Sequence, residues 1–226
     1  MAKPGKVNRQ KIKVTQNGPY VVTGEVPLVE QIVQIDKDGQ CHGWKEGRKF
    51  PTGDTYTLCR CGKSKNKPFC DGSHNQFDFD GRETANRELF SNRAKVTEGP
   101  GLTLTDVPEL CSSARFCHRA TGFWEMLERS HDPVAKQICI EEACDCPSGR
   151  LVVWDKNGQM IEPDLEPSIG IVVDPEASAG GPLWVRGRIP IEAADGRVYE
   201  VRNRVTLCSC GKSDNKPYCD GSHMDK

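Results

Sequence analysis

A sixteen-residue cysteine and histidine pattern occurs twice in the chain and constrains its possible folds more than any other feature. Each copy reads Cys-x-Cys-x2-Ser-x3-Pro-x-Cys-Asp-Gly-Ser-His, and the second copy follows the first at an offset of 149 residues. Three thiolates and one imidazole form a complete donor set for a metal centre. The sequence therefore predicts two Cys3His metal sites, with the ligands Cys59, Cys61, Cys70 and His74 in the first and Cys208, Cys210, Cys219 and His223 in the second.

The spacing within each copy indicates how the ligands are arranged. Cys59 and Cys61 stand two residues apart, so in extended backbone both thiolates point to one side. Cys70 and His74 stand four apart, which places them on one face of a helical turn. A closed Cys3His zinc site is one interpretation of this set, although zinc knuckles place two to four residues between the first two cysteines, where this chain has one.

The twelve cysteines of the 226-residue chain are interpreted as metal ligands or free thiols. Residues 1–10 hold no apolar signal region, and no apolar run is long enough to span a membrane, so we expect a cytoplasmic, soluble protein in a reducing compartment. Disulfides are also disfavoured because three cysteines per motif pair poorly. At 36% hydrophobic residues the chain is poor in core, and bound metal would compensate for that.

Charge and motif content exclude several classes of function. The net charge is −1 with the signs interspersed, which predicts no general attraction to nucleic acid or to acidic membranes. The sequence shows no nucleophile–base constellation, phosphate loop or dinucleotide fingerprint, so we do not expect an enzyme. The lysine run at residues 63–67 is either a solvated surface or a surface that steers an acidic redox partner.

The surroundings of the motif repeat as well. Gly181–Ile191 matches Gly18–Leu28 in its glycine, proline and β-branched positions at an offset of 163, so the first unit carries about 14 extra residues. We interpret these as a longer hairpin that contains Cys41-His42. The predicted organisation is a disordered tail (1–10), a first β-rich module (11–84), an inserted segment with its linker (85–180) and a second β-rich module (181–226).

The inserted segment differs from the two β-rich modules in its pattern of apolar residues. Apolar spacing predicts a helix over residues 115–129 and a shorter one over 134–143. Residues 151–154 and 169–173 are typical of strands, and 176–181 of a flexible link.

Both sixteen-residue copies resemble, without a departure, the CDGSH iron–sulfur domain family, also called NEET proteins. The resemblance implies one [2Fe–2S] cluster per copy, held by the three cysteines and the histidine. It also implies a mainly β fold with small helices (α+β), in which two modules pack about a two-fold axis. Because one chain carries both copies, we expect an internal pseudo-dimer and a monomeric protein.

A second resemblance covers residues 105–155. Cys111-x5-Cys117 followed by Cys146-Pro147-Ser148-Gly149 resembles the divergent single-cluster [4Fe–4S] domain, a ferredoxin relative. A third cluster would take Cys111, Cys117 and Cys146, with Cys144 or Cys139 as the fourth ligand. Alternatives are a segment that packs as a plain core with buried thiols, and zinc or redox-thiol use of Cys144-x-Cys146.

The predicted function is electron transfer with pH-sensitive clusters. A histidine bound to iron through one nitrogen keeps the other free to take a proton near physiological pH. Protonation of His74 or His223 would weaken the Fe–N bond. The alternatives are cluster storage and transfer to apo-proteins, redox sensing, and a zinc-bound interaction module. The expected partner is a redox protein or an apo-protein cluster acceptor.

Overall fold

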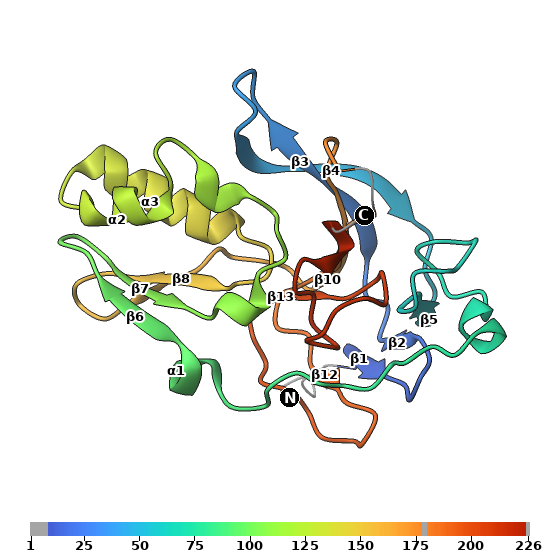
Figure 1. The fold of residues 1–226 in the computed structure, drawn as a ribbon. Coiled ribbons are helices and arrows are strands. Elements are labelled where there is room, and N and C mark those ends of the chain that lie inside the picture. Colours follow the sequence, from blue (N-terminus) through green and yellow to red (C-terminus); the bar gives the residue numbers. More distant parts are fainter. Residues whose placement is uncertain (1–8, 178–179, 225–226) are drawn as a thin grey trace, which may run out of the picture.

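A computed structural model describes residues 9–177 and 180–224, so most of the predicted tail and part of the predicted link fall outside the described residues. The described chain forms three β-sheets and few helices, which confirms the predicted mainly β, α+β class (Figure 1). Sheet one contains, in spatial order, β12 (Ile191–Glu192), β1 (Lys11–Val14), β2 (Tyr20–Thr23) and β5 (Thr55–Leu58). Sheet two contains β13 (Arg204–Leu207), β11 (Leu183–Arg186), β10 (Ser168–Val173), β3 (Leu28–Ile35) and β4 (Cys41–Phe50). Sheet three contains β6 (Lys95–Glu98), β7 (Thr103–Asp106), β8 (Leu151–Trp154) and β9 (Met160–Ile161).

The helices are short. Three are α-helices: α1 (Phe90–Arg93), α2 (Phe123–Glu128) and α3 (Pro133–Asp145). Four are 3-10 turns: η1 (Ser73–Gln76), η2 (Pro108–Leu110), η3 (Phe116–His118) and η4 (Ser222–Met224). None of the helices in the described part of the chain is long and apolar enough to cross a membrane.

Sheets one and two repeat the same pairing. In sheet one β2 runs antiparallel to β5 with Tyr20 opposite Leu58, and in sheet two β11 runs antiparallel to β13 with Leu183 opposite Leu207. These pairs are related by the offsets of 163 and 149 found in the sequence. The repeat is therefore structural as well as sequential.

Each of these two sheets also takes a strand from the other half of the chain. β12 lies parallel to β1 with Ile191 opposite Ile12. β3 lies parallel to β10 with Leu28 opposite Ile169. Leu28 and Ile191 are again 163 residues apart. The two exchanged strands thus occupy equivalent positions in the two sheets.

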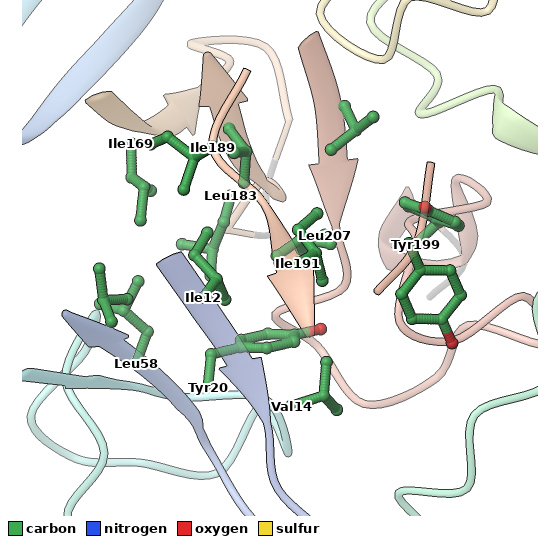
Figure 2. Packing of buried hydrophobic residues seen from close by; sticks show 14 of the residues in the cluster. Ile12, Val14, Tyr20, Leu58, Ile169, Leu183, Ile189, Ile191, Tyr199 and Leu207 are labelled. Carbon is green, nitrogen blue, oxygen red and sulfur yellow. The ribbon is translucent and has the colours of Figure 1, made fainter. Parts of the chain in front are cut away.

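One apolar core joins the two sheets. Alternation makes this possible, because in β1 Ile12 and Val14 are buried while Lys11 and Lys13 face solvent. Figure 2 shows side chains from both sheets packed against one another, among them Ile12, Tyr20, Leu58, Ile169, Leu183, Ile191 and Leu207. The strands of the two sheets therefore bury these side chains together.

The middle of the chain forms its own layer, with α2 and α3 packed on sheet three (Figure 1). Asp132 caps α3, its Oδ1 accepting from the amides of Val134 (2.7 Å) and Ala135 (3.0 Å). The helix predicted over 134–143 is confirmed. The predicted helix over 115–129 is wrong in extent, because Arg115, Ala120 and Gly122 have positive φ values that interrupt a right-handed helix.

Two further predictions meet the structure here. The β3–β4 hairpin contains Cys41, which lies opposite Ile35, as the sequence predicts for the extra residues of the first unit. β10 falls inside the range predicted as the insertion, yet its neighbours are β11 and β3. The division into residues 11–84, 85–180 and 181–226 stays a prediction.

A buried arginine connects β13 to the middle layer. The Arg204 side chain is 1% exposed and forms an ion pair with Glu162 (2.9 Å). It also donates to backbone carbonyls of the middle layer, those of Ala143, Cys144, Cys146 and Leu151. A buried charge of this kind depends on all of its partners.

Replacing Arg204 by methionine should lower the free energy of unfolding by about 3–5 kcal/mol, because Glu162 and the carbonyls lose their partner. Urea unfolding at equal iron content measures the change. The control is Arg197→Met, which removes an exposed pair with Asp195 and should cost about 0–1 kcal/mol. Equal losses in the two variants would contradict the role assigned to Arg204.

Candidate metal centres

The first Cys3His set forms directly after β5. The Sγ atoms of Cys59 and Cys61 lie 3.8 Å apart. The Sγ of Cys70 lies 3.5 Å from Nδ1 of His74, and the Gly72 amide donates to that sulfur at 3.4 Å. Backbone hydrogen bonds between residues 57–59 and 68–70 hold the two halves of the loop together.

The second set has the same geometry after β13. The Sγ atoms of Cys208 and Cys210 lie 3.7 Å apart, and the Sγ of Cys219 lies 3.5 Å from Nδ1 of His223. The hydrogen bond with the Cys208 side chain lowers the pKa of Cys210 to about 6. Each site thus presents a Cys–Cys pair and a Cys–His pair.

These distances fit ligands of tetrahedral metal ions. Two thiolates bound at about 2.3 Å to one tetrahedral ion lie about 3.8 Å apart, and a thiolate with an imidazole nitrogen at about 2.0–2.1 Å lies about 3.5–3.6 Å away. Over residues 9–177 and 180–224, no three His, Cys, Asp or Glu side chains gather tightly enough to hold a single ion. The donors are therefore preset as pairs.

The other motif residues hold each loop in shape. In the first loop Ser64 Oγ donates to the carbonyl of Phe69 (2.6 Å). The Asp71 carboxylate accepts from the amides of Ser73 (2.9 Å) and Lys65 (2.7 Å). The Ser73 side chain, together with these two amides, holds the pKa of Asp71 well below its usual range. Ser213 and Asp220 make the same backbone bonds in the second loop.

The two loops touch each other. A Cβ added at Gly62 would lie 2.3 Å from the carbonyl oxygen of Cys210, and one added at Gly211 would lie 2.8 Å from that of Cys61. Tyr20 connects the sites as well, since its hydroxyl donates to the carbonyl of Cys208 (2.9 Å). Glycine at both positions allows this close approach.

The residue between the paired cysteines differs between the sites. Arg60, 1% exposed, donates through Nε to the carbonyl of Gly18 (2.8 Å). Ser209 Oγ donates to the carbonyl of Gly181 (2.7 Å), which is the equivalent position at the offset of 163. The first site therefore has a buried cation where the second has a hydroxyl.

Three middle cysteines, Cys111, Cys117 and Cys146, line one cavity. Burial, together with the neighbouring thiols of Cys146 and Cys111, raises the pKa of Cys117 to about 12. Arg150 lines the same cavity and is held by Asp106 (Nε–Oδ1 2.6 Å). The spacing identified these three residues, and the structure places them together.

The proposed fourth ligands lie elsewhere. Cys144 lies near Arg204 and Glu162 rather than in this cavity, and its pKa is raised by burial. Cys139 is fully buried between α3 and α2, and its thiol donates to the carbonyl of Phe123 (3.7 Å). The predicted set of four cysteines is thus reduced to three. Sequence spacing missed Arg150 and Asp106, for which no local pattern exists.

Comparisons with known proteins agree with this geometry. The model of the family described as "Iron-binding zinc finger CDGSH type" matches residues 17–75 and 180–224, and that of "Divergent 4Fe-4S mono-cluster" matches residues 97–156. A 22-residue segment is 73% identical to "CDGSH iron-sulfur domain-containing protein 3, mitochondrial" of Mus musculus, covering 10% of this chain and 16% of that protein. No solved structure matches the chain.

The fold and the sites thus define an iron–sulfur protein. Two segments of the chain match the CDGSH iron–sulfur domain family in tandem, and a divergent 4Fe–4S segment lies between them.

The contact between the loops can be tested at Gly62. Gly62→Ala should lower stability and reduce the iron bound at both sites, because the new Cβ meets the Cys210 carbonyl. The control is Gly39→Ala. Gly39 has the same φ of +77°, but a Cβ added there would meet nothing within 4 Å, so the substitution should cost only the strain of a left-handed residue, about 1–2 kcal/mol of stability. Thermal unfolding and iron analysis compare the two variants, and equal effects would exclude the loop contact as the cause.

Proposed function

We propose that each CDGSH site binds one [2Fe–2S] cluster and that the protein carries single electrons. The supporting observation is the division of each donor set into two pairs, since a binuclear cluster takes two protein ligands per iron. A bound [2Fe–2S] cluster supplies a one-electron couple, and replacing thiolate by imidazole raises its potential. The chain supplies the eight ligands, and burial of Cys219 and His223 limits water at the second site.

We also propose that the two CDGSH modules form an internal pseudo-dimer. The exchanged strands β3 and β12, with equivalent registers at one offset, support this arrangement. The contacts of Gly62 with Cys210 and of Gly211 with Cys61 add to it, because they relate the two loops reciprocally. A monomer with an internal two-fold is the expected solution state.

The remaining parts of the proposal follow from charge and composition. We propose a non-catalytic carrier in the cytoplasm, with no nucleic-acid or membrane partner and with a redox protein or apo-protein as its partner. Cluster storage and transfer, or redox sensing, is the second candidate. It is favoured by the half-buried state of Cys70 and His74, which a receiving protein could reach. A zinc-bound module is the third, and zinc sites are colourless.

A third cluster is proposed on Cys111, Cys117 and Cys146. The shared cavity and the raised pKa of Cys117 support it, because closely packed thiols resist ionisation unless a cation binds them. With three cysteines at the cavity, one position of a cubane cluster would take a non-cysteine ligand.

Metal analysis tests these assignments directly. Anaerobically purified protein should hold about four irons for two [2Fe–2S] clusters and about three or four more for the middle site, with matching sulfide and no zinc. Cys117→Ala should remove only the middle irons, whereas Cys144→Ala should remove none. Zinc in place of iron, or loss of iron in Cys144→Ala, would contradict the proposal.

The histidine ligands should make the clusters acid-sensitive. Protonation of the imidazole competes with iron, so lowering the pH should speed the loss of visible absorbance. If a single proton triggers the loss, its rate should rise by about tenfold per pH unit, and therefore by more than tenfold between pH 8 and pH 6. His74→Cys and His223→Cys should slow that loss and lower the potential of the altered site. Unchanged acid sensitivity in both variants would exclude the histidines as its cause.

A further inference from the structure

The two CDGSH sites share a motif but differ in their cover. Cys70 and His74 are half-buried in the first site. Their equivalents Cys219 and His223 are only 2% and 7% exposed. The backbone hydrogen bonds made by the motif serine and aspartate are matched in the two loops, so these bonds do not explain the difference.

The chain itself covers the second site. The amides of Thr84 and Ala85 donate to the carbonyl of Lys216 at 2.8 and 2.9 Å. Asn215 Nδ2 donates to the carbonyl of Glu109 at 2.8 Å. These bonds bring the segments before and within the middle region onto the second loop.

The tightest contact lies beside the ligand pair. A Cβ added at Gly221 would lie 2.3 Å from Ser113 Oγ, whereas one added at the equivalent Gly72 finds only Asn75 of its own turn, at 4.0 Å. Residues 112–114 and His223 also line a common cavity. The segment that carries Cys111 thus closes the second site on the side of its histidine.

The uncovered first site has a different charge. Between its ligands it carries three exposed lysines, Lys63, Lys65 and Lys67, against one exposed aspartate, Asp71, and the exposed Asp78 and Asp80 follow the last ligand. The equivalent stretch of the second loop carries two lysines and two aspartates. Phe77, 41% exposed, directly follows η1, which contains His74, and adds an exposed aromatic side chain three residues after this ligand.

We propose that the face formed by Lys63, Lys65, Lys67, His74 and Phe77 is the docking surface for a small acidic electron-carrier protein, and that the second site is closed to partners. An exposed aromatic centre within a charged rim is typical of protein interfaces. Lysines steer an acidic partner to the rim before contact, and the closed site exchanges electrons through the first. This rests on the proposed function.

Matched single variants test the docking surface. Lys63→Glu and Lys212→Glu change equivalent exposed positions of the two loops, and an acidic plant-type [2Fe–2S] ferredoxin serves as the probe. Stopped-flow mixing of the reduced ferredoxin, freed of excess dithionite, with the oxidised protein gives the electron-transfer rate, because the histidine-ligated cluster has the higher potential and accepts the electron. Calorimetry with the oxidised ferredoxin gives the binding constant independently of the clusters. At low ionic strength Lys63→Glu should slow the reaction and weaken binding about tenfold, with a loss of salt dependence, while Lys212→Glu should change either by less than about twofold.

The outcomes separate this proposal from the proposed function. Iron content and the visible spectrum of each variant report whether the clusters are present. If they are absent, the proposed function fails, and calorimetry still tests docking. Three outcomes would each overturn the docking surface. They are equal effects of the two substitutions, no binding of the ferredoxin, and binding of anionic phosphatidylserine vesicles, in place of the ferredoxin, by the same lysines.

Discussion

Strand exchange between the two halves of the chain is the constraint on which the rest of the structure depends. β12 completes the sheet that begins with β1, and β3 completes the sheet built on β10. Parallel neighbours such as these cannot be joined by a tight turn, so long connections are required between them. The chain uses those connections to place the middle layer, and the shared core holds both metal loops against each other.

The placement of the loops decides what the ligands can do. Each loop begins at the end of a core strand and is tied back by its serine and aspartate, so its donor atoms are positioned before metal binds. Preset donors avoid the entropy of ordering a flexible loop around a metal. The contact of Gly62 with Cys210 then brings the two loops against each other.

The middle layer makes two nearly identical sites unequal. It covers the second loop through Glu109 and Ser113 and leaves the first loop open. Its thiols Cys111, Cys117 and Cys146 lie behind that cover, beside Arg150. Arg204 fastens the same layer to β13, so the cover is held by a buried ion pair and four carbonyls rather than by a loose loop.

The sequence alone identified the candidate ligand residues and much of the repeat. Ligand types at a fixed spacing are a local property, so Cys59, Cys61, Cys70 and His74 could be identified with their second copies, and the offset of 163 predicted that Leu28 and Ile191 are equivalent. Short apolar runs likewise predicted β8 and β10. Apolar spacing overextended the helix before Arg129, because it carries no information on backbone at Arg115 or Gly122 that turns to positive φ.

Only the tertiary structure decided which strands are exchanged, which three middle cysteines share a cavity and which site is covered. Each of these depends on contacts between residues far apart in the chain, such as Ser113 with Gly221 or Arg204 with Ala143. Two copies of one motif have the same local conformational preferences. Their difference in exposure arises from packing energy summed over distant segments, which spacing within either copy does not encode.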